Sequence, residues 1–458
     1  MHAVRLETLK LRFQYASHLE NRDATCQLPK FGEGESVTDR VVVTGLGVLS
    51  PIGDGLETFE SGLREGRSGI QFRPELEALG FRCQVARVPE GIEKLRDQYF
   101  DHVTLLGMDR YTTIGCIAGL DCWEDAGFSR RPTTDVDWET SVVFGSALGG
   151  LETAGKTLTP AMDAGHVRPL GSVIPERLMW SSASARLGGL LGLGGQVTTN
   201  SSACSTGTEA IANGFWIIRE GRAARVLAGG CEGYSPYIWA GFDAMRVLCR
   251  NSNQTPDRAS RPMSASAAGF VPAAGAGAVM LESLPSALAR GAKIYAEVAG
   301  AAATCGGQRN GGTMTFGNPE GVRRCIHRAL AVAGLVAEDV DLISGHLTST
   351  AGDVFEANNW RCALQLPDER FPLLNAPKSL FGHTLGAAGA IECVAAVLQL
   401  KGGFVHPSLN CEDLHPELAW CERSVVRRCI ERELGVVAKA SFGFGDVNTC
   451  IVFRSYRN

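Results

Sequence analysis

Four residues in three glycine-rich segments could carry out covalent and acid-base chemistry together. Cys204 stands in a run of small residues, Ser-Ser-Ala-Cys-Ser-Thr-Gly, directly before a segment with helical periodicity. A thiol at a helix N-terminus lies at the positive end of the helix dipole, which favours the thiolate and therefore nucleophilic attack. The small neighbours leave room for a substrate to reach the sulfur. The pattern indicates a nucleophile, although an inert buried cysteine is the common alternative.

Two histidines and a lysine follow in two further glycine-rich turns. His346 comes directly after the apolar segment 340–344. This order predicts that His346 lies at the C-terminal end of a buried strand, where open α/β sheets place their active sites. Lys378 precedes His383 by five residues, and a Gly/Ala-rich helix start follows. Each histidine alone is as easily a structural residue, but three candidates of complementary chemistry favour one shared site.

A glycine loop near the C-terminus, Ser-Phe442-Gly-Phe444-Gly-Asp446, could turn its backbone N–H groups toward a developing oxyanion. Taken alone, this loop is more simply an ordinary β-turn. An earlier glycine run, Gly45-Leu-Gly47, follows a strand-like segment, but it lacks the third glycine and the acidic residue of a dinucleotide site.

Buried strands and amphipathic helices that alternate along the chain would position these side chains. Their alternation predicts an α/β protein with largely parallel sheets. Continuous apolar runs typical of buried strands occur at 41–50, 141–145, 226–230, 276–281, 340–344 and 450–453. Helical periodicity occurs over 108–126, 206–220, 321–333 and 387–400.

Composition excludes several classes of function. The 458 residues include 44 Lys and Arg against 49 Asp and Glu, a net charge of −5, which argues against nucleic-acid binding. The 15 cysteines show neither CxxC pairs nor zinc-ligand spacing, so we expect a reduced, cytoplasmic protein without a metal site. No apolar run approaches the roughly 18 residues of a membrane span. Residues 1–38 lack an apolar secretory core and are interpreted as an extension of unknown role.

Taken together, these segments resemble the β-ketoacyl-acyl carrier protein synthases, on the chain-elongating branch of these condensing enzymes of fatty-acid and polyketide synthesis. The resemblance covers residues 41–453. It rests on VVVTGLGVLSPIG, Met108-Asp-Arg110, SALGGLE, SSACSTGTEAI, TPDRASRP, KSLFGHTLGAAGAIE and SFGFGDVN.

The resemblance implies a thiolase-type fold, in which two similar α/β halves form a layered α-β-α-β-α core. Residues 39–290 would carry the cysteine and residues 291–458 the two histidines. It further implies a homodimer whose partners are acyl carrier protein and malonyl-acyl carrier protein. The substrates would be carried on phosphopantetheine, with no cofactor bound by the enzyme itself.

Site roles follow from the resemblance by position. Cys204 would accept the acyl chain, while His346 and His383 would bind the malonyl thioester and promote its decarboxylation. Lys378 would order the histidines together with Glu392. Three further groups complete the implied site: the acidic residues Asp353 and Glu356, the oxyanion-hole N–H groups of Cys204 and Phe444, and the gate residues Phe444 and Phe442.

Several positions depart from the family pattern. Leu347 replaces the glycine after the first histidine, and the proline of that motif is missing. Asp446 replaces the second glycine of the gate loop. These departures spare the nucleophile and both histidines, and they indicate a divergent branch in a specialised lipid or polyketide pathway. The remaining replacements are Ser264, Ala267 and Ala268 for an acidic and basic cluster, and Ala274 for a glutamate.

Two alternative functions stay open at this point. The chain could be a non-condensing partner subunit that sets chain length in a heterodimeric synthase, but such subunits typically lack the cysteine. It could also be a thiolase-like enzyme acting on coenzyme A esters. Those enzymes typically use a second cysteine as proton-transfer base, whereas the C-terminal turn here reads Phe444-Gly-Asp446.

Overall fold

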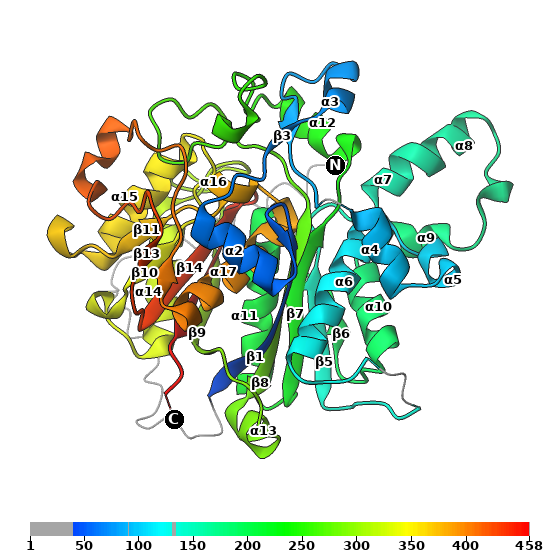
Figure 1. The fold of residues 1–458 in the computed structure, drawn as a ribbon, viewed down its shortest axis with the longest axis horizontal. Helices are drawn as coiled ribbons and strands as arrows, with labels where there is room; N and C mark the ends of the chain where they lie inside the picture. The colour runs from blue at the N-terminus through cyan, green and yellow to red at the C-terminus, as the bar shows by residue number, and fades with distance from the viewer. Residues whose placement is uncertain (1–39, 90, 131–133, 458) are drawn as a thin grey trace, which may run out of the picture. The chain divides into compact units, whose positions relative to one another are not determined.

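A mixed β-sheet runs through the centre of the computed structural model, which describes residues 40–89, 91–130 and 134–457 (Figure 1). The predicted extension at 1–38 lies outside these residues. The strands follow one another in space in the order β11-β10-β14-β15-β9-β1-β8-β7-β5-β6. Their bounds are β1 Val41–Ser50, β5 Thr140–Gly145, β6 Val197–Thr198, β7 Arg225–Glu232, β8 Gly275–Ser283, β9 Ala296–Cys305, β10 Leu342–Ser344, β11 Leu373–Asn375, β14 Val436–Gly443 and β15 Val447–Arg454.

The sheet consists of two groups of five strands with the same topology. The spatial order is β1-β8-β7-β5-β6 in one group and β9-β15-β14-β10-β11 in the other. When the strands of each group are numbered along the chain, both orders read first, fifth, fourth, second, third. The two groups meet where β1 pairs antiparallel with β9 over Val41–Val43. This repeated order is the two-half arrangement expected for the predicted fold class.

The strand directions differ from the prediction of largely parallel sheets. Only the pairings of β5 with β6 and β7, and of β10 with β11 and β14, are parallel. The pairings of β7 with β8, β8 with β1, β14 with β15 and β15 with β9 are antiparallel. A three-residue turn joins β14 to β15, and so short a connection can only join antiparallel strands.

Each group of five strands forms one β layer, and helices form the other three of five layers. α11 (Thr206–Arg219) and α17 (Ala388–Gly402) contact strands of both groups and form the middle layer. α6 (Arg110–Asp125) and α10 (Ser182–Leu191) cover the first group, and α14 (Pro319–Ala333) covers the second, next to α15 (Gly352–Leu364). The order is therefore α-β-α-β-α, as predicted.

Shorter elements surround these layers. The strands are β2 Gly53–Asp54, β3 Gln71–Phe72, β4 Val85–Ala86, β12 Phe404–Val405 and β13 Ile430–Glu431. The helices are α2 Leu56–Glu65, α3 Pro74–Ala78, α4 Ile92–Tyr99, α5 His102–Leu106, α7 Leu151–Thr153, α8 Thr159–Asp163, α9 Ile174–Leu178, α12 Pro236–Ala244, α13 Leu284–Ala289 and α16 Lys378–Phe381.

The middle position explains the composition of α17. A helix between two sheets has no solvent-facing side, and every residue of Ala388–Leu400 is buried. Contrary to the prediction that no run reaches membrane-spanning length, Leu385–Gly402 is long and apolar enough by length and composition. However, 89% of that window is buried within the protein, as in the core helix of a layered fold.

All six predicted strand segments and all four predicted helices coincide with observed elements. Every cysteine among the described residues is free. The sequence did not reveal the long strands β9 and β14 or the short strands β6 and β11.

The close contact between β8 and α17 predicts an effect on stability. A Cβ atom at Gly277 would lie 2.5 Å from the backbone of Ala390 and Ile391. We expect Gly277→Ala to lower the free energy of unfolding by about 1–3 kcal/mol, because an overpacked core must shift its backbone. Chemical denaturation would measure the loss. Gly189→Ala on α10, where a Cβ meets no atom within 4 Å, is the control and should be neutral or stabilising.

Candidate active site

Cys204 lies at the N-terminal end of α11, as predicted. β6 ends at Thr198, and Cys204 occupies a single 3-10 turn, Ala203–Ser205, directly before the helix. The hydroxyl of Thr206 holds this turn by donating to the carbonyl of Ala203 and accepting from the amide of Ser202. The turn directs the sulfur into a cavity of about 440 Å³, which both histidines, Phe442 and Phe444 also line.

The surroundings of Cys204 favour the protonated thiol. Burial raises its pKa to about 11, although the charge of Lys378 and a hydrogen bond from the Phe444 backbone amide act in the opposite direction. Desolvation thus acts against the thiolate preference that was predicted for the helix end. The sulfur must lose its proton as it attacks.

His346 follows β10 directly, and two carboxylates on α15 fix its loop. The side chain of Glu356 accepts the backbone amides of His346 and Leu347, each at 2.7 Å. Asp353 accepts the amides of Thr348, at 2.6 Å, and of Ser349, at 3.0 Å. Glu356 and Asp353 thus hold the backbone around His346.

Leu347 explains one departure from the family pattern. Its side chain is 1% exposed and packs in the apolar cluster that also contains Ile343 and Trp360. A side chain at this position thus anchors the loop in the core, which glycine could not do.

A buried ion pair lies behind His346. The ammonium of Lys378 contacts Glu392 Oε1 at 2.5 Å, and both side chains are at most 1% exposed. The same ammonium donates to the His346 carbonyl at 2.7 Å and lies 3.2 Å from His346 Nδ1. The structure therefore brings together the predicted pair and the histidine that this pair was expected to order.

His383 lies between α16 and α17, next to the thiol. Its Nε2 is 3.1 Å from Cys204 Sγ, and its Nδ1 accepts the backbone N–H of Leu385 at 3.2 Å. Backbone hydrogen bonds in both directions with the segment 271–273 fix the loop. The His346 and His383 rings lie 5.4 Å apart between centroids.

These contacts determine where each histidine carries its proton. An N–H group or ammonium faces Nδ1 of both rings, so the proton of each neutral ring resides on Nε2, which faces the cavity. Burial, followed by the charge of Lys378, lowers the pKa of both His346 and His383 well below the ordinary value. Both rings are therefore neutral donors at neutral pH.

The thiol and the two imidazoles could in principle also bind a metal ion. Ligand atoms of Cys204, His346 and His383 lie within 4.8 Å of one another, and one thiol with two imidazoles is a set that zinc accepts. However, a protonated Nε2 has no lone pair for a metal. Within the described part of the chain, the chemistry of this cluster suits hydrogen-bond donation better than metal binding.

The C-terminal glycine loop covers the cavity. Phe442 lies 6.3 Å from the His346 ring, and Phe444 lies 6.3 Å from Phe242, between ring centroids. The structure thus brings both predicted gate residues into the cavity wall.

Asp446 has a distinct part in this loop. Its φ of 61° is left-handed, a conformation that usually favours glycine. Its carboxylate accepts the amides of Asn318, at 2.8 Å, and Gln308, at 3.0 Å, and Gly445 donates to the carbonyl of Met314 at 2.7 Å. The replacement of glycine therefore ties the loop to the segment 306–318.

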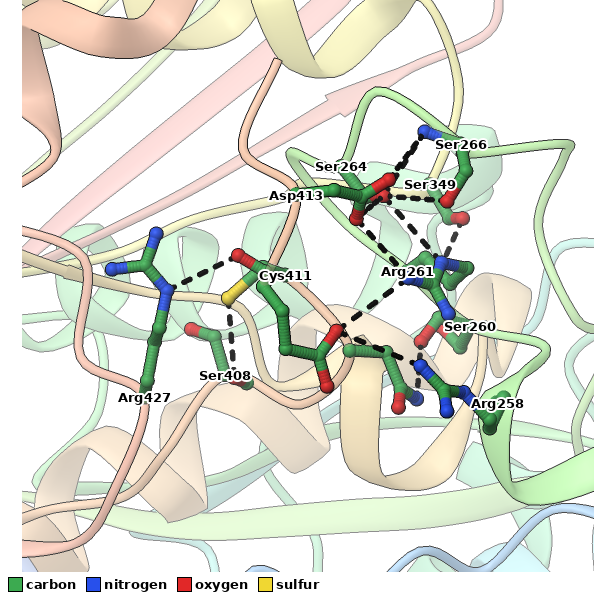
Figure 2. Close-up of polar contacts among 12 residues, drawn as sticks. Arg258, Ser260, Arg261, Ser264, Ser266, Ser349, Ser408, Cys411, Asp413 and Arg427 are labelled. Atoms are coloured by element: carbon green, nitrogen blue, oxygen red, sulfur yellow. Dashed lines mark hydrogen bonds and ion pairs between the residues drawn. The ribbon is translucent and has the colours of Figure 1, made fainter.

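A serine-rich network explains another departure. Figure 2 shows the Asp413 carboxylate among Ser264, Ser266 and Arg261. The backbone amide of Arg261 in turn donates to Ser349 Oγ at 3.0 Å, within the loop that follows His346. Asp413, which comes from a distant loop, thus forms hydrogen bonds with the segment 261–266, where the family pattern has an acidic and basic cluster of its own. Of the remaining replacements, Ala274 is fully buried in an apolar cluster and Ala268 packs against the same cluster, whereas nothing in the structure explains Ala267.

Two buried charged side chains in this region were not predicted as site residues. Lys439 on β14 lies 2.9 Å from Glu392 Oε2. Glu232, at the end of β7, accepts the amides of Ala147 and Gly386, and burial raises its pKa to about 7. In the sequence, Lys439 could have been recognised as a single charged residue within an apolar strand-like segment.

Thiol reactivity should report the resting state of Cys204. Because burial raises its pKa to about 11, we expect its alkylation rate by iodoacetamide to keep rising up to pH 10. Peptide mass spectrometry would follow Cys204 separately, with the exposed Cys362 as internal control. A rate that levels off below pH 8 would show that the thiolate is already stabilised.

Comparison with known proteins agrees with this geometry. The chain matches the family profiles "Beta-ketoacyl synthase, N-terminal domain" over residues 38–287 and "Beta-ketoacyl synthase, C-terminal domain" over residues 295–412. It is 33% identical to 3-oxoacyl-[acyl-carrier-protein] synthase 1 of Haemophilus influenzae, over 91% of this chain and 99% of the relative. It is 35% identical to 3-oxoacyl-[acyl-carrier-protein] synthase 2 of Rhizobium meliloti, over 91% and 99%.

Solved structures show the same fold. A β-ketoacyl synthase from Burkholderia phymatum STM815 superposes with a TM-score of 0.84 at 27% identity, over 92% of this chain and all of that one. The ishigamide ketosynthase/chain length factor superposes with a TM-score of 0.81 at 30% identity, with the same coverage. These matches confirm the predicted resemblance and the fold class. The chain belongs to the β-ketoacyl synthase family of condensing enzymes.

Proposed function

We propose that Cys204, His346 and His383 carry out the condensation that defines this family, between an acyl group on Cys204 and malonyl-acyl carrier protein. The observation that carries the proposal is the convergence of one thiol and two imidazole N–H donors in a single cavity. The reaction has two half-reactions at one sulfur, which is the basis of ping-pong kinetics.

In the first half-reaction, the Cys204 sulfur attacks the thioester of an acyl-acyl carrier protein. A bond forms between this sulfur and the acyl carbon, and the bond to the carrier thiol breaks. The proton that leaves Cys204 ends on the departing carrier thiol, so the exchange is neutral overall. His383 Nε2–H and the Phe444 amide face the sulfur and stabilise its developing negative charge.

In the second half-reaction, the malonyl thioester loses carbon dioxide. The electron pair of the broken bond moves onto the thioester oxygen as an enolate, which the Nε2–H groups of His346 and His383 stabilise. Neutral imidazoles suit this role because their protons already point into the cavity.

The enolate carbon then attacks the acyl carbonyl on Cys204. The backbone N–H groups of Cys204 and Phe444 hold the resulting oxyanion, which collapses and expels the Cys204 thiolate. The product is a β-ketoacyl thioester two carbons longer than the acyl substrate, and the thiolate takes up one proton. Phe444 and Phe442 gate the cavity between the half-reactions.

The supporting residues act through the histidines. Lys378, paired with Glu392, orients His346 from its Nδ1 side, and Asp353 and Glu356 fix the loop that carries it. They are positioning residues because their side chains contact the histidine and the backbone of its loop.

The wider setting belongs to the same proposal. Acyl carrier protein delivers both substrates on phosphopantetheine, and the enzyme binds no cofactor of its own. A solved relative at 28% identity, "AntDE:AntF (apo)", is described as a carrier protein in complex with its ketosynthase. We further propose a cytoplasmic homodimer in a fatty-acid or specialised polyketide pathway, with halves at 39–290 and 291–458.

A non-condensing chain-length subunit is the main competing function. One structural relative is itself a ketosynthase/chain length factor. Here, however, the thiol is present and lies 3.1 Å from a histidine, which favours a condensing subunit.

Cys204→Ala should abolish acyl loading, because no other thiol lines the cavity among the described residues. Intact-protein mass spectrometry after incubation with a panel of acyl-acyl carrier proteins would measure the acyl adduct. Cys362→Ala, at an exposed cysteine, is the matched control and should load normally. A Cys204→Ala protein that still elongated its substrate would refute the proposed nucleophile.

His383→Ala should retain acyl loading, at a reduced rate because one of two donors to the sulfur is lost, but it should lose condensation. The variant lacks one of two donors for the enolate, so we expect the condensation rate to fall by at least about 100-fold. The rate of carbon dioxide release from malonyl-acyl carrier protein, measured on acylated enzyme, would test this. His166→Ala, at an exposed histidine, is the control. Normal turnover of the His383→Ala variant would contradict the assigned role.

A further inference from the structure

A second buried lysine lies behind the catalytic histidines. Lys439 is 0% exposed in the middle of β14, where it pairs in register with Ser344 of β10 and Ile451 of β15. Burying an ammonium costs several kcal/mol unless it is well paired. A lysine inside a strand of the core therefore requires a specific partner.

That partner is Glu392. Lys439 Nζ lies 2.9 Å from Glu392 Oε2 in an ion pair without hydrogen-bond geometry, whereas Glu392 Oε1 contacts Lys378. The Lys439 ammonium also donates to Ser441 Oγ at 3.1 Å and contacts the Ala440 carbonyl. One buried carboxylate is thus held between two lysines on opposite oxygens.

We propose that Lys439 is a positioning residue for the condensation half-reaction, because it fixes Glu392 so that Lys378 faces Nδ1 of His346. This inference rests on the proposed function of the site. Two strands meet in this arrangement: β10 leads directly to His346, and β14 leads to the loop with Phe442 and Phe444. Lys439 therefore connects the histidine side of the site to the gate side.

The charge of Lys439 acts on the same groups. After burial and Lys378, it is among the causes that lower the pKa of His346 and His383. It also opposes the effect of burial, which raises the pKa of Glu356 to about 7. The titratable groups that face it from the packed elements are Glu392 and Cys393 on α17, Lys378 on α16, Glu356 on α15, Cys450 on β15, and the two histidines.

The sign of the pH effect follows from these contacts. Removal of a positive charge makes protonation of both histidines and of Glu356 easier. A histidine protonated at Nδ1 would face another donor, and a protonated Glu356 would hold the backbone around His346 less tightly. Both changes predict that the acid limb of the condensation rate moves to higher pH.

The test compares Lys439→Met and Lys439→Gln with wild type, using acyl loading and condensation rates across pH. Both variants retain Lys378 and Glu392, and Gln can still donate to Glu392. We expect normal acyl loading, a loss of condensation rate of about 10-fold in Lys439→Met, a smaller loss in Lys439→Gln, and an acid limb at higher pH in both. Lys94→Met, at an exposed lysine, is the control.

Unchanged rate and acid limb in variants that load acyl groups would overturn the inference. If neither variant loads an acyl group, the same measurements are made on Lys439→Arg, which keeps the positive charge. An acid limb of the condensation rate at the wild-type pH supports the role of the charge, and an acid limb at higher pH refutes it. Measurements on the wild-type protein distinguish failure of the proposed function from failure of the proposed role of Lys439. If it does not elongate any substrate, the proposed function fails. If it elongates normally and the variants match it, only the role of Lys439 fails.

Discussion

The site depends on one constraint, which is that a hydrogen-bond donor occupies Nδ1 of both histidines. The Leu385 amide faces one ring and the Lys378 ammonium faces the other, so both rings present Nε2–H to the cavity. The rest of the site serves this arrangement. α15 fixes the loop of the first ring through two carboxylates, and the segment 271–273 fixes the loop of the second by backbone hydrogen bonds. A donor pair held in this way does not need to reorganise when negative charge develops.

The layered fold explains why so many charges can be buried behind the cavity. The middle layer offers no solvent to Glu392, and two lysines from neighbouring elements compensate its charge within 3 Å. Such a cluster contributes little net stability, since desolvation offsets the ionic attraction. Its value lies in geometry, because it fixes groups on α16, α17 and β14 relative to one another. The Cys204 thiol, in contrast, has no ion-pair partner among the described residues, and burial raises its pKa to about 11.

Much of the site could be predicted from the sequence, because the reacting side chains stand in glycine-rich motifs at strand and helix ends. Cys204 before α11 and His346 after β10 are local features that spacing reveals. The network of Asp413 with Arg261 and Ser264 could not be predicted, since it joins segments about 150 residues apart. The same holds for the ion pair of Lys439, whose strand passes beside α17 only in the folded chain. The antiparallel pairings were not predicted, because an apolar run indicates a buried strand but not the direction in which it runs.

The tie between the gate loop and the segment 306–318 opposes movement of Phe444. The Asp446 carboxylate and the Gly445 amide together make three hydrogen bonds to that segment. At about 1 kcal/mol each, they favour the closed loop by about 3 kcal/mol, which corresponds to an open population on the order of 1%. Movement of Phe444 is then a rare event that requires several bonds to break together. Under the proposed function, a substrate that requires the open loop would therefore bind with an apparent affinity lowered by about this fraction.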